Sequence, residues 1–186
     1  MLLPVLDTLN SKRIILASAS VNRKNIIEKS GLKFEVSPST FEENLPHSDF
    51  ASSSDYVVKT SEMKLLDKLS EFSHKGEYAD IIIVADTIIS IEDKHIMEKP
   101  RDPEHAFEML RTLSDCGSHE VLTSVWIAFV KKADVGEGQQ VLEISKKANI
   151  LDRTKVYFEK MDDLTIKSYV ASGEPFGKAG GYGIQG

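Results

Sequence analysis

The chain has 186 residues, of which 41% are hydrophobic and 28% charged, as is ordinary for one globular unit with a sizeable core. With 29 acidic and 23 basic residues the net charge is −6, which argues against binding of extended nucleic acid but leaves room for a small anion in a local basic pocket. The single cysteine, Cys116, excludes an intramolecular disulfide framework and a cysteine-rich zinc site. The amino terminus has no signal-peptide pattern and no run is long enough to span a membrane, so we expect a cytoplasmic protein without a membrane partner.

The first elements in the chain enclose a turn rich in hydroxyl groups. We expect strands at residues 14–17 and 32–37, and helices at residues 21–29 and 53–72. Ser18 and Ser20 lie where the first strand passes into the first helix, and Arg23 lies in the first turn of that helix. Free backbone N–H groups and a positive charge at such a turn suit a phosphate. Ser20 as a simple helix cap, with solvated basic residues beside it, explains the same pattern equally well.

Two further charged residues in the first half admit more than one interpretation. Glu43, next to Glu42 in a loop, can offer oxygen to a hard divalent cation, although adjacent glutamates in a loop are commonly just solvated. Lys64 falls off the apolar stripe of the helix expected at residues 53–72, so the residues alone predict a solvent-exposed lysine.

The most apolar stretch, residues 81–85, predicts a strand that is buried on both faces. The strand is followed by Asp86. A carboxylate presented by a rigid buried strand is typical of ligand sites in open α/β sheets. Asp86 and Thr87 can also simply end the strand as a turn or a helix cap.

The second half predicts a hairpin, two helices and further strands. Lys99 precedes Pro100, which restrains the backbone and can direct the lysine ammonium, although a turn explains the pair as well. Six of the eleven glycines lie in residues 172–186, so this segment either approaches a ligand closely or is a floppy tail. The expected strands are residues 88–91, 95–97, 120–130, 141–150 and 155–158, and the expected helices begin at residue 102 or 103 and at residue 164.

Four motifs together resemble the Maf family of nucleoside-triphosphate pyrophosphatases. They are residues 17–23 (ASASVNR), 85–87 (ADT), 98–100 (EKP) and 174–186 (EPFGKAGGYGIQG), in the family's order. The resemblance implies an α/β fold of the inosine-triphosphate-pyrophosphatase-like type, with a long mixed β-sheet flanked by helices and two lobes around a cleft. It also implies one Maf-like domain over residues 1–186 and a homodimer.

The resemblance assigns a role to each matched position. Asp86 is the expected proton acceptor, and Glu43 the expected ligand of a divalent metal, Mg²⁺ or Mn²⁺. The expected substrate is a nucleoside triphosphate, cleaved to the monophosphate and pyrophosphate. The expected phosphate-binding residues are Ser18, Ser20, Arg23, Lys64 and Lys99, and those expected to select the base are Asn22, Thr87 and Gln185.

Two departures from the family pattern leave alternatives open. Asn22 stands where the family usually has an arginine tied to base preference, and this chain stops at Gly186 whereas family members normally continue through a closing segment of sheet. We therefore expect a weakened fold or activity if that segment is absent. The pattern is closest to the subfamily that acts on dTTP and UTP, with 7-methyl-GTP hydrolysis or a non-catalytic nucleotide-binding regulatory role as alternatives.

Overall fold

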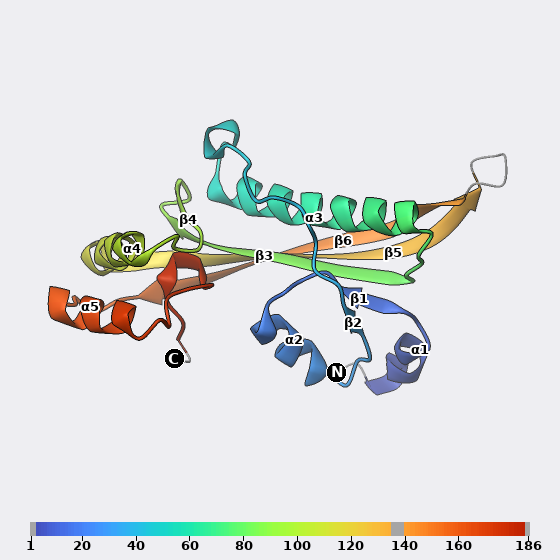
Figure 1. The fold of residues 1–186 in the computed structure, drawn as a ribbon, viewed down its shortest axis with the longest axis horizontal. Coiled ribbons are helices and arrows are strands. Elements are labelled where there is room, and N and C mark those ends of the chain that lie inside the picture. Colours follow the sequence, from blue (N-terminus) through green and yellow to red (C-terminus); the bar gives the residue numbers. More distant parts are fainter. Residues whose placement is uncertain (1–2, 135–139, 185–186) are drawn as a thin grey trace. The chain divides into compact units, whose positions relative to one another are not determined.

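The computed structural model of the chain describes residues 3–134 and 140–184 (Figure 1). Its strands form a six-stranded sheet in the order β2-β1-β3-β5-β6, with β4 paired to β3. The strands are β1 (Ile14–Leu16), β2 (Glu35–Val36), β3 (Ile81–Ile91), β4 (His95–Met97), β5 (Ser118–Asp134) and β6 (Gln140–Tyr157). The α-helices are α1 (Leu6–Asn10), α2 (Val21–Glu28), α3 (Ser53–Lys75), α4 (Pro103–Cys116) and α5 (Asp163–Ala171). No helix within residues 3–134 and 140–184 is long and apolar enough to cross a bilayer.

The sheet is mixed, as predicted. β1 pairs in parallel with both β2 and β3, whereas β4 pairs antiparallel with β3. The chain divides into two compact units, and the boundary on β3 falls between Asp86 and Thr87. The first unit comprises Met1–Asn44, Val58–Asp86 and Ser124–Ile150, and the second comprises Leu45–Val57, Thr87–Thr123 and Leu151–Gly186. Two units agree with the two expected lobes, while the assignment of one Maf-like domain stays a prediction.

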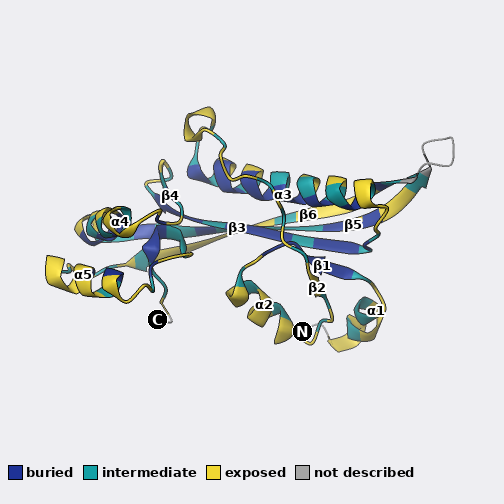
Figure 2. Cartoon of the chain, in the orientation of Figure 1, coloured by how far each residue is buried: buried dark blue, intermediate teal, exposed yellow. Residues whose placement is uncertain are grey.

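The first unit is built around the parallel strands. Buried side chains of α3 pack on β1 and the first half of β3, both of which are deeply buried in Figure 2. Burial of large aliphatic and aromatic side chains is the main favourable term in such a core. The core side chains include Ile15, Leu65, Phe72, Ile82, Val84, Ala128 and Leu142.

The second unit has two small cores that meet at α4. One joins α4 to the end of β3 and to β4, and the other joins α4 to α5. The limits of α4 follow the sequence, because Asp102 caps its amino terminus by accepting a hydrogen bond from the His105 N–H at 2.7 Å, and Gly117 ends it in the left-handed conformation. The helix begins at residue 103, as predicted.

Several predicted boundaries are wrong, among them those of β5, which spans Ser118–Asp134 instead of residues 120–130. β3 runs unbroken through Asp86 and Thr87, where a turn or cap was one interpretation. β6 continues to Tyr157, so residues 155–158 do not form a separate strand. β2 spans only Glu35–Val36 instead of residues 32–37, and both of its residues are exposed, so few buried contacts extend it.

Candidate active site

Asp86 is a buried carboxylate in the middle of a strand. The residue is 4% exposed, and its Oδ1 atom accepts a hydrogen bond from Lys64 Nζ at 2.7 Å. Its Oδ2 atom is buried and has no hydrogen-bond partner among the described residues. A buried carboxylate oxygen without a partner is costly, so such atoms mark places where a ligand, ion or water is expected.

Lys64 joins two carboxylates. Its Nζ atom lies 2.7 Å from Asp86 Oδ1 and 2.9 Å from Glu43 Oε1, and the residue is buried. The solvent-exposed lysine expected from the apolar stripe alone is therefore wrong. A buried ammonium is tolerated only when it is paired, and here the partners come from a distant strand and a distant loop.

The turn between β1 and α2 brings a guanidinium next to Asp86. Arg23 Nη1 donates to Ser18 Oγ at 3.2 Å and to the carbonyl oxygen of Ala85, the neighbour of Asp86, at 2.8 Å. Ser20 caps α2, since its Oγ atom accepts from the Arg23 N–H at 3.4 Å. The cap interpretation of Ser20 is confirmed, and a phosphate contact by this residue stays a prediction.

Arg23 carries its charge in a partly buried place. Burial lowers the pKa of its guanidinium, and the nearby charges of Asp86 and Glu43 act in the opposite direction. An arginine keeps its proton at neutral pH even after such a shift. The cluster therefore combines two carboxylates with two cations, one of which is tied to the backbone beside Asp86.

The first unit thus brings together Ser18, Ser20, Arg23, Glu43, Lys64 and Asp86. Asn22 is exposed in the first turn of α2. Thr87 belongs to the second unit, where its hydroxyl lies 3.1 Å from that of Thr123, and Lys99 is exposed after β4 in the same unit. Gln185 lies outside the described residues. The roles expected of these four residues stay predictions.

Part of the glycine-rich segment is packed, so the floppy-tail interpretation is wrong for residues 179–182. Gly180 and Gly181 are buried, and the Gly180 N–H donates to the carbonyl of Glu98 at 2.9 Å. Tyr182 Oη lies 2.6 Å from Nε2 of His119, a buried residue that carried no sequence signal. Burial raises the pKa of Tyr182 to about 12 and lowers the pKa of His119, so the neutral forms of both side chains are favoured.

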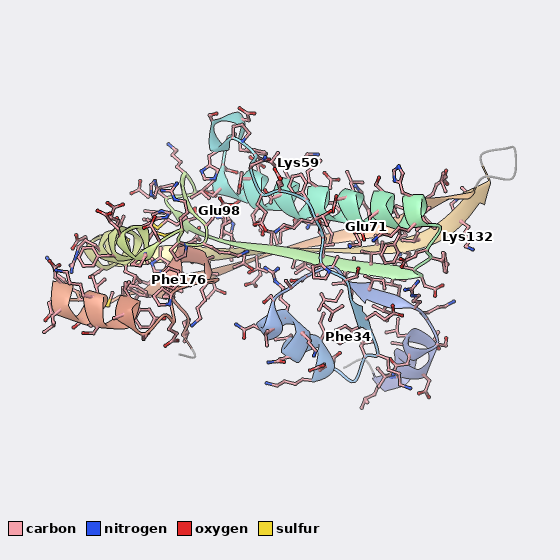
Figure 3. The ribbon with its side chains drawn as sticks, viewed as in Figure 1. Phe34, Lys59, Glu71, Glu98, Lys132 and Phe176 are labelled. Atoms are coloured by element: carbon pink, nitrogen blue, oxygen red, sulfur yellow. The ribbon has the colours of Figure 1, made fainter. Side chains whose placement is uncertain are left out.

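Sequence reasoning also missed two residues of α3. Lys68 is 1% exposed and contacts Ser37 Oγ at 3.2 Å and the carboxylate of Glu71, which is labelled in Figure 3. Asp67 accepts hydrogen bonds from the segment that leads to Glu43. Their spacing from Lys64 along the helix was the only signal that could have found them.

The residues present fit a magnesium-type ion. No group of three histidine, cysteine, aspartate or glutamate side chains within the described ranges could hold a metal by itself. Asp86 and Glu43 nevertheless converge on the same ammonium, and Asp86 Oδ2 has no hydrogen-bond partner in the part of the chain that the structure describes. Mg²⁺ is commonly held by one or two carboxylates together with water and substrate phosphates, and this donor set can supply the protein's share.

Comparison with known proteins adds independent information. A human "probable bifunctional dTTP/UTP pyrophosphatase/methyltransferase protein" is 40% identical over 185 residues, which cover 99% of this chain but only 28% of the human protein. A "dTTP/UTP pyrophosphatase" of Ruminiclostridium cellulolyticum is 36% identical over 94% of this chain and 80% of its own length. A solved structure, a nucleoside-triphosphatase or dITP/XTP pyrophosphatase of Mycobacterium abscessus, aligns with a TM-score of 0.43 and 15% identity over 80% of this chain and 74% of that chain.

The family comparison covers nearly the whole sequence. The family described as "Maf-like protein" matches residues 13–186, a range that contains every residue of the cluster described above. The chain belongs to the Maf-like protein family.

Proposed function

We propose that the chain is a nucleoside-triphosphate pyrophosphatase that converts dTTP and UTP to their monophosphates and pyrophosphate. The observation that carries the proposal is Asp86, a buried carboxylate. Lys64 fixes one of its oxygens, and the other has no hydrogen-bond partner within residues 3–134 and 140–184. The names of relatives such as the Ruminiclostridium cellulolyticum enzyme support the choice of substrate.

The reaction needs an acceptor for a proton and positive charge near the phosphates. Water attacks the α-phosphorus, a new P–O bond forms, the bond from that phosphorus to the bridging oxygen breaks, and pyrophosphate leaves. Asp86 takes the proton of the attacking water, a role that requires a carboxylate within reach of that water. Arg23 supplies positive charge where negative charge accumulates, and Lys64 holds both carboxylates in place.

A divalent cation completes the proposal. Mg²⁺ or Mn²⁺ would be held by Asp86 and Glu43, and when bound it would neutralise charge on the triphosphate and favour ionisation of the attacking water. Phosphate contacts by Ser18, Ser20 and Lys99, and base selection by Asn22, Thr87 and Gln185, belong to the same proposal. So do a cytoplasmic location and a homodimer.

The test is pyrophosphate release from dTTP, UTP, CTP, GTP and 7-methyl-GTP with Mg²⁺ or Mn²⁺, using the wild type and Asp86→Asn. We expect release from dTTP and UTP, and a loss of about 100- to 10,000-fold in Asp86→Asn with nucleotide binding retained. Asp80→Asn is the matched control. Asp80 precedes the same strand, and its Oδ2 accepts from the Arg13 N–H at 2.8 Å, so its loss tests a structural aspartate.

The outcomes separate the alternatives. Release only from 7-methyl-GTP would keep the enzyme class and change the substrate. Nucleotide binding by folded protein without any release would favour the regulatory role. Full activity of Asp86→Asn would remove Asp86 from the chemistry.

A further inference from the structure

The segment that carries Glu43 has no regular secondary structure. Residues 37–44 follow β2, and the segment starts from Ser37, whose N–H donates to the carbonyl of Leu16 on β1 at 3.0 Å. Ser37 Oγ also accepts from Lys68 of α3 at 3.2 Å. A loop of this kind positions a functional carboxylate only if further contacts restrain it.

Asp67 supplies these contacts midway along the segment. Its Oδ2 atom accepts from Ser39 Oγ at 2.7 Å, from the Thr40 N–H at 2.9 Å and from the Phe41 N–H at 3.1 Å. One carboxylate oxygen thereby restrains three consecutive residues. Hydrogen bonds to an ionised acceptor are shorter and stronger than neutral ones, so this anchor restrains the backbone two residues before Glu43.

One face of α3 contacts both Asp86 and the segment of residues 37–44. Lys64, Asp67 and Lys68 are spaced three and four residues apart, so they project from neighbouring positions on the helix. Lys64 bonds both Glu43 and Asp86, while Asp67 fixes the approach of the chain to Glu43. The rigid helix therefore sets the separation of the two carboxylates.

We propose that Asp67 is a positioning residue that acts through Glu43, holding its carboxylate in register with Lys64 and Asp86. This inference rests on the proposed pyrophosphatase function and adds a residue to it. A simple loop anchor would stabilise the fold without any special relation to Glu43. The two roles differ in whether the effects of Asp67 and Glu43 on turnover are coupled.

The experiment is a double-mutant cycle with Asp67→Asn, Glu43→Gln and the double variant, assayed for pyrophosphate release from dTTP with Mg²⁺. We expect Asp67→Asn to lower kcat by about 10- to 100-fold, as loss of a supporting hydrogen-bonded residue commonly does, and to change the same kinetic parameter as Glu43→Gln. In the double variant the loss should match that of Glu43→Gln within about threefold, because the two residues act as one unit. Amide hydrogen exchange at Thr40 and Phe41 should accelerate in Asp67→Asn, which checks the contact without measuring activity.

Asp162→Asn is the matched control, because Asp162 also accepts a backbone N–H, from Thr165 at 2.7 Å, but caps α5 in the second unit. In a double variant with Glu43→Gln, the fold-losses in kcat caused by the two substitutions should multiply. If Asp67→Asn does not fold, Ser39→Ala serves in its place. It removes the bond from Ser39 Oγ to Asp67 and the bond that Ser39 Oγ accepts from the Phe41 N–H at 3.1 Å, and it should show the same coupling.

Each outcome decides the inference. Three results would overturn it. The first is that the effects of Asp67→Asn and Glu43→Gln on kcat multiply in the double variant. The others are a Glu43→Gln variant with normal turnover and a folded Asp67→Asn variant with kcat within about threefold of the wild type. A wild type that releases no pyrophosphate from any nucleotide would overturn the proposed function itself, and the inference with it.

Discussion

Two buried lysines one helical turn apart on α3 offer a stringent test of the site. Lys64 bonds two carboxylates, at 2.7 and 2.9 Å, whereas Lys68 bonds Ser37 and Glu71. Replacing each lysine by methionine removes the charge and keeps most of the volume. The two substitutions are chemically identical, so a difference between them must come from their partners.

The structure gives the expected magnitudes. Lys64→Met leaves Asp86, which is 4% exposed, without its ammonium partner, and loss of one member of a buried pair costs about 3–5 kcal/mol. For a chain of this size that is a fall in Tm of about 6–20 °C. Lys68→Met should cost less than about 2 kcal/mol, because Glu71 keeps Lys75 at 2.7 Å and methionine packs well beside Phe72.

The assay combines thermal unfolding with pyrophosphate release. Lys64→Met should lose at least about 100-fold in kcat/KM through displacement of Asp86 and Glu43, and Lys68→Met about tenfold at most. The double variant Lys64→Met/Asp86→Asn should be more stable than Lys64→Met alone by about 1–3 kcal/mol, because it no longer buries an unpaired carboxylate. Equal losses in the two methionine variants, or a double variant no more stable than Lys64→Met, would refute this reasoning.

Two predictions concern the second unit. Burial lowers the pKa of His119, so its contribution to stability is complete above the unfolded value of 6.5 and is lost as the pH falls from there toward the folded value. The free energy of unfolding should therefore fall by up to about 1.4 kcal/mol per pH unit in that window, and comparing the pH dependence of Tm with that of His119→Gln isolates this slope. Gly180→Ala should destabilise far more than Gly177→Ala, although both glycines have a similar positive φ. A Cβ atom at Gly180 would lie 2.4 Å from Ile89 Cγ1, whereas one at Gly177 would have no atom of the described residues within 4 Å. Urea denaturation of the two variants measures the difference, and equal midpoints would contradict the packing of this segment.

Elements whose signals are local were predictable from the sequence. α4 has its cap at Asp102, its left-handed glycine at Gly117 and an apolar face, so its limits follow from neighbouring residues. The buried strand through residues 81–85 was equally clear. Its continuation was not, because the polar pair Asp86-Thr87 indicates a turn unless its distant partners are known.

The candidate site depended on contacts that no local pattern encodes. The apolar stripe of α3 excludes Lys64, yet Lys64 is buried. Hydrophobic periodicity along a helix does not reveal that Glu43 and Asp86, which are distant in sequence, both form ion pairs with Lys64. Only the resemblance to a family singled out Lys64, and neither route pointed to Asp67 or His119.

The most direct test of the account is hydrolysis of dTTP and UTP by the wild type with Mg²⁺ in water enriched in oxygen-18, followed by mass spectrometry of both products. Attack of water on the α-phosphorus predicts one labelled oxygen in the monophosphate and unlabelled pyrophosphate. Three results would contradict the proposed reaction: labelled oxygen in the pyrophosphate, release of inorganic phosphate instead of pyrophosphate, or no turnover of either nucleotide.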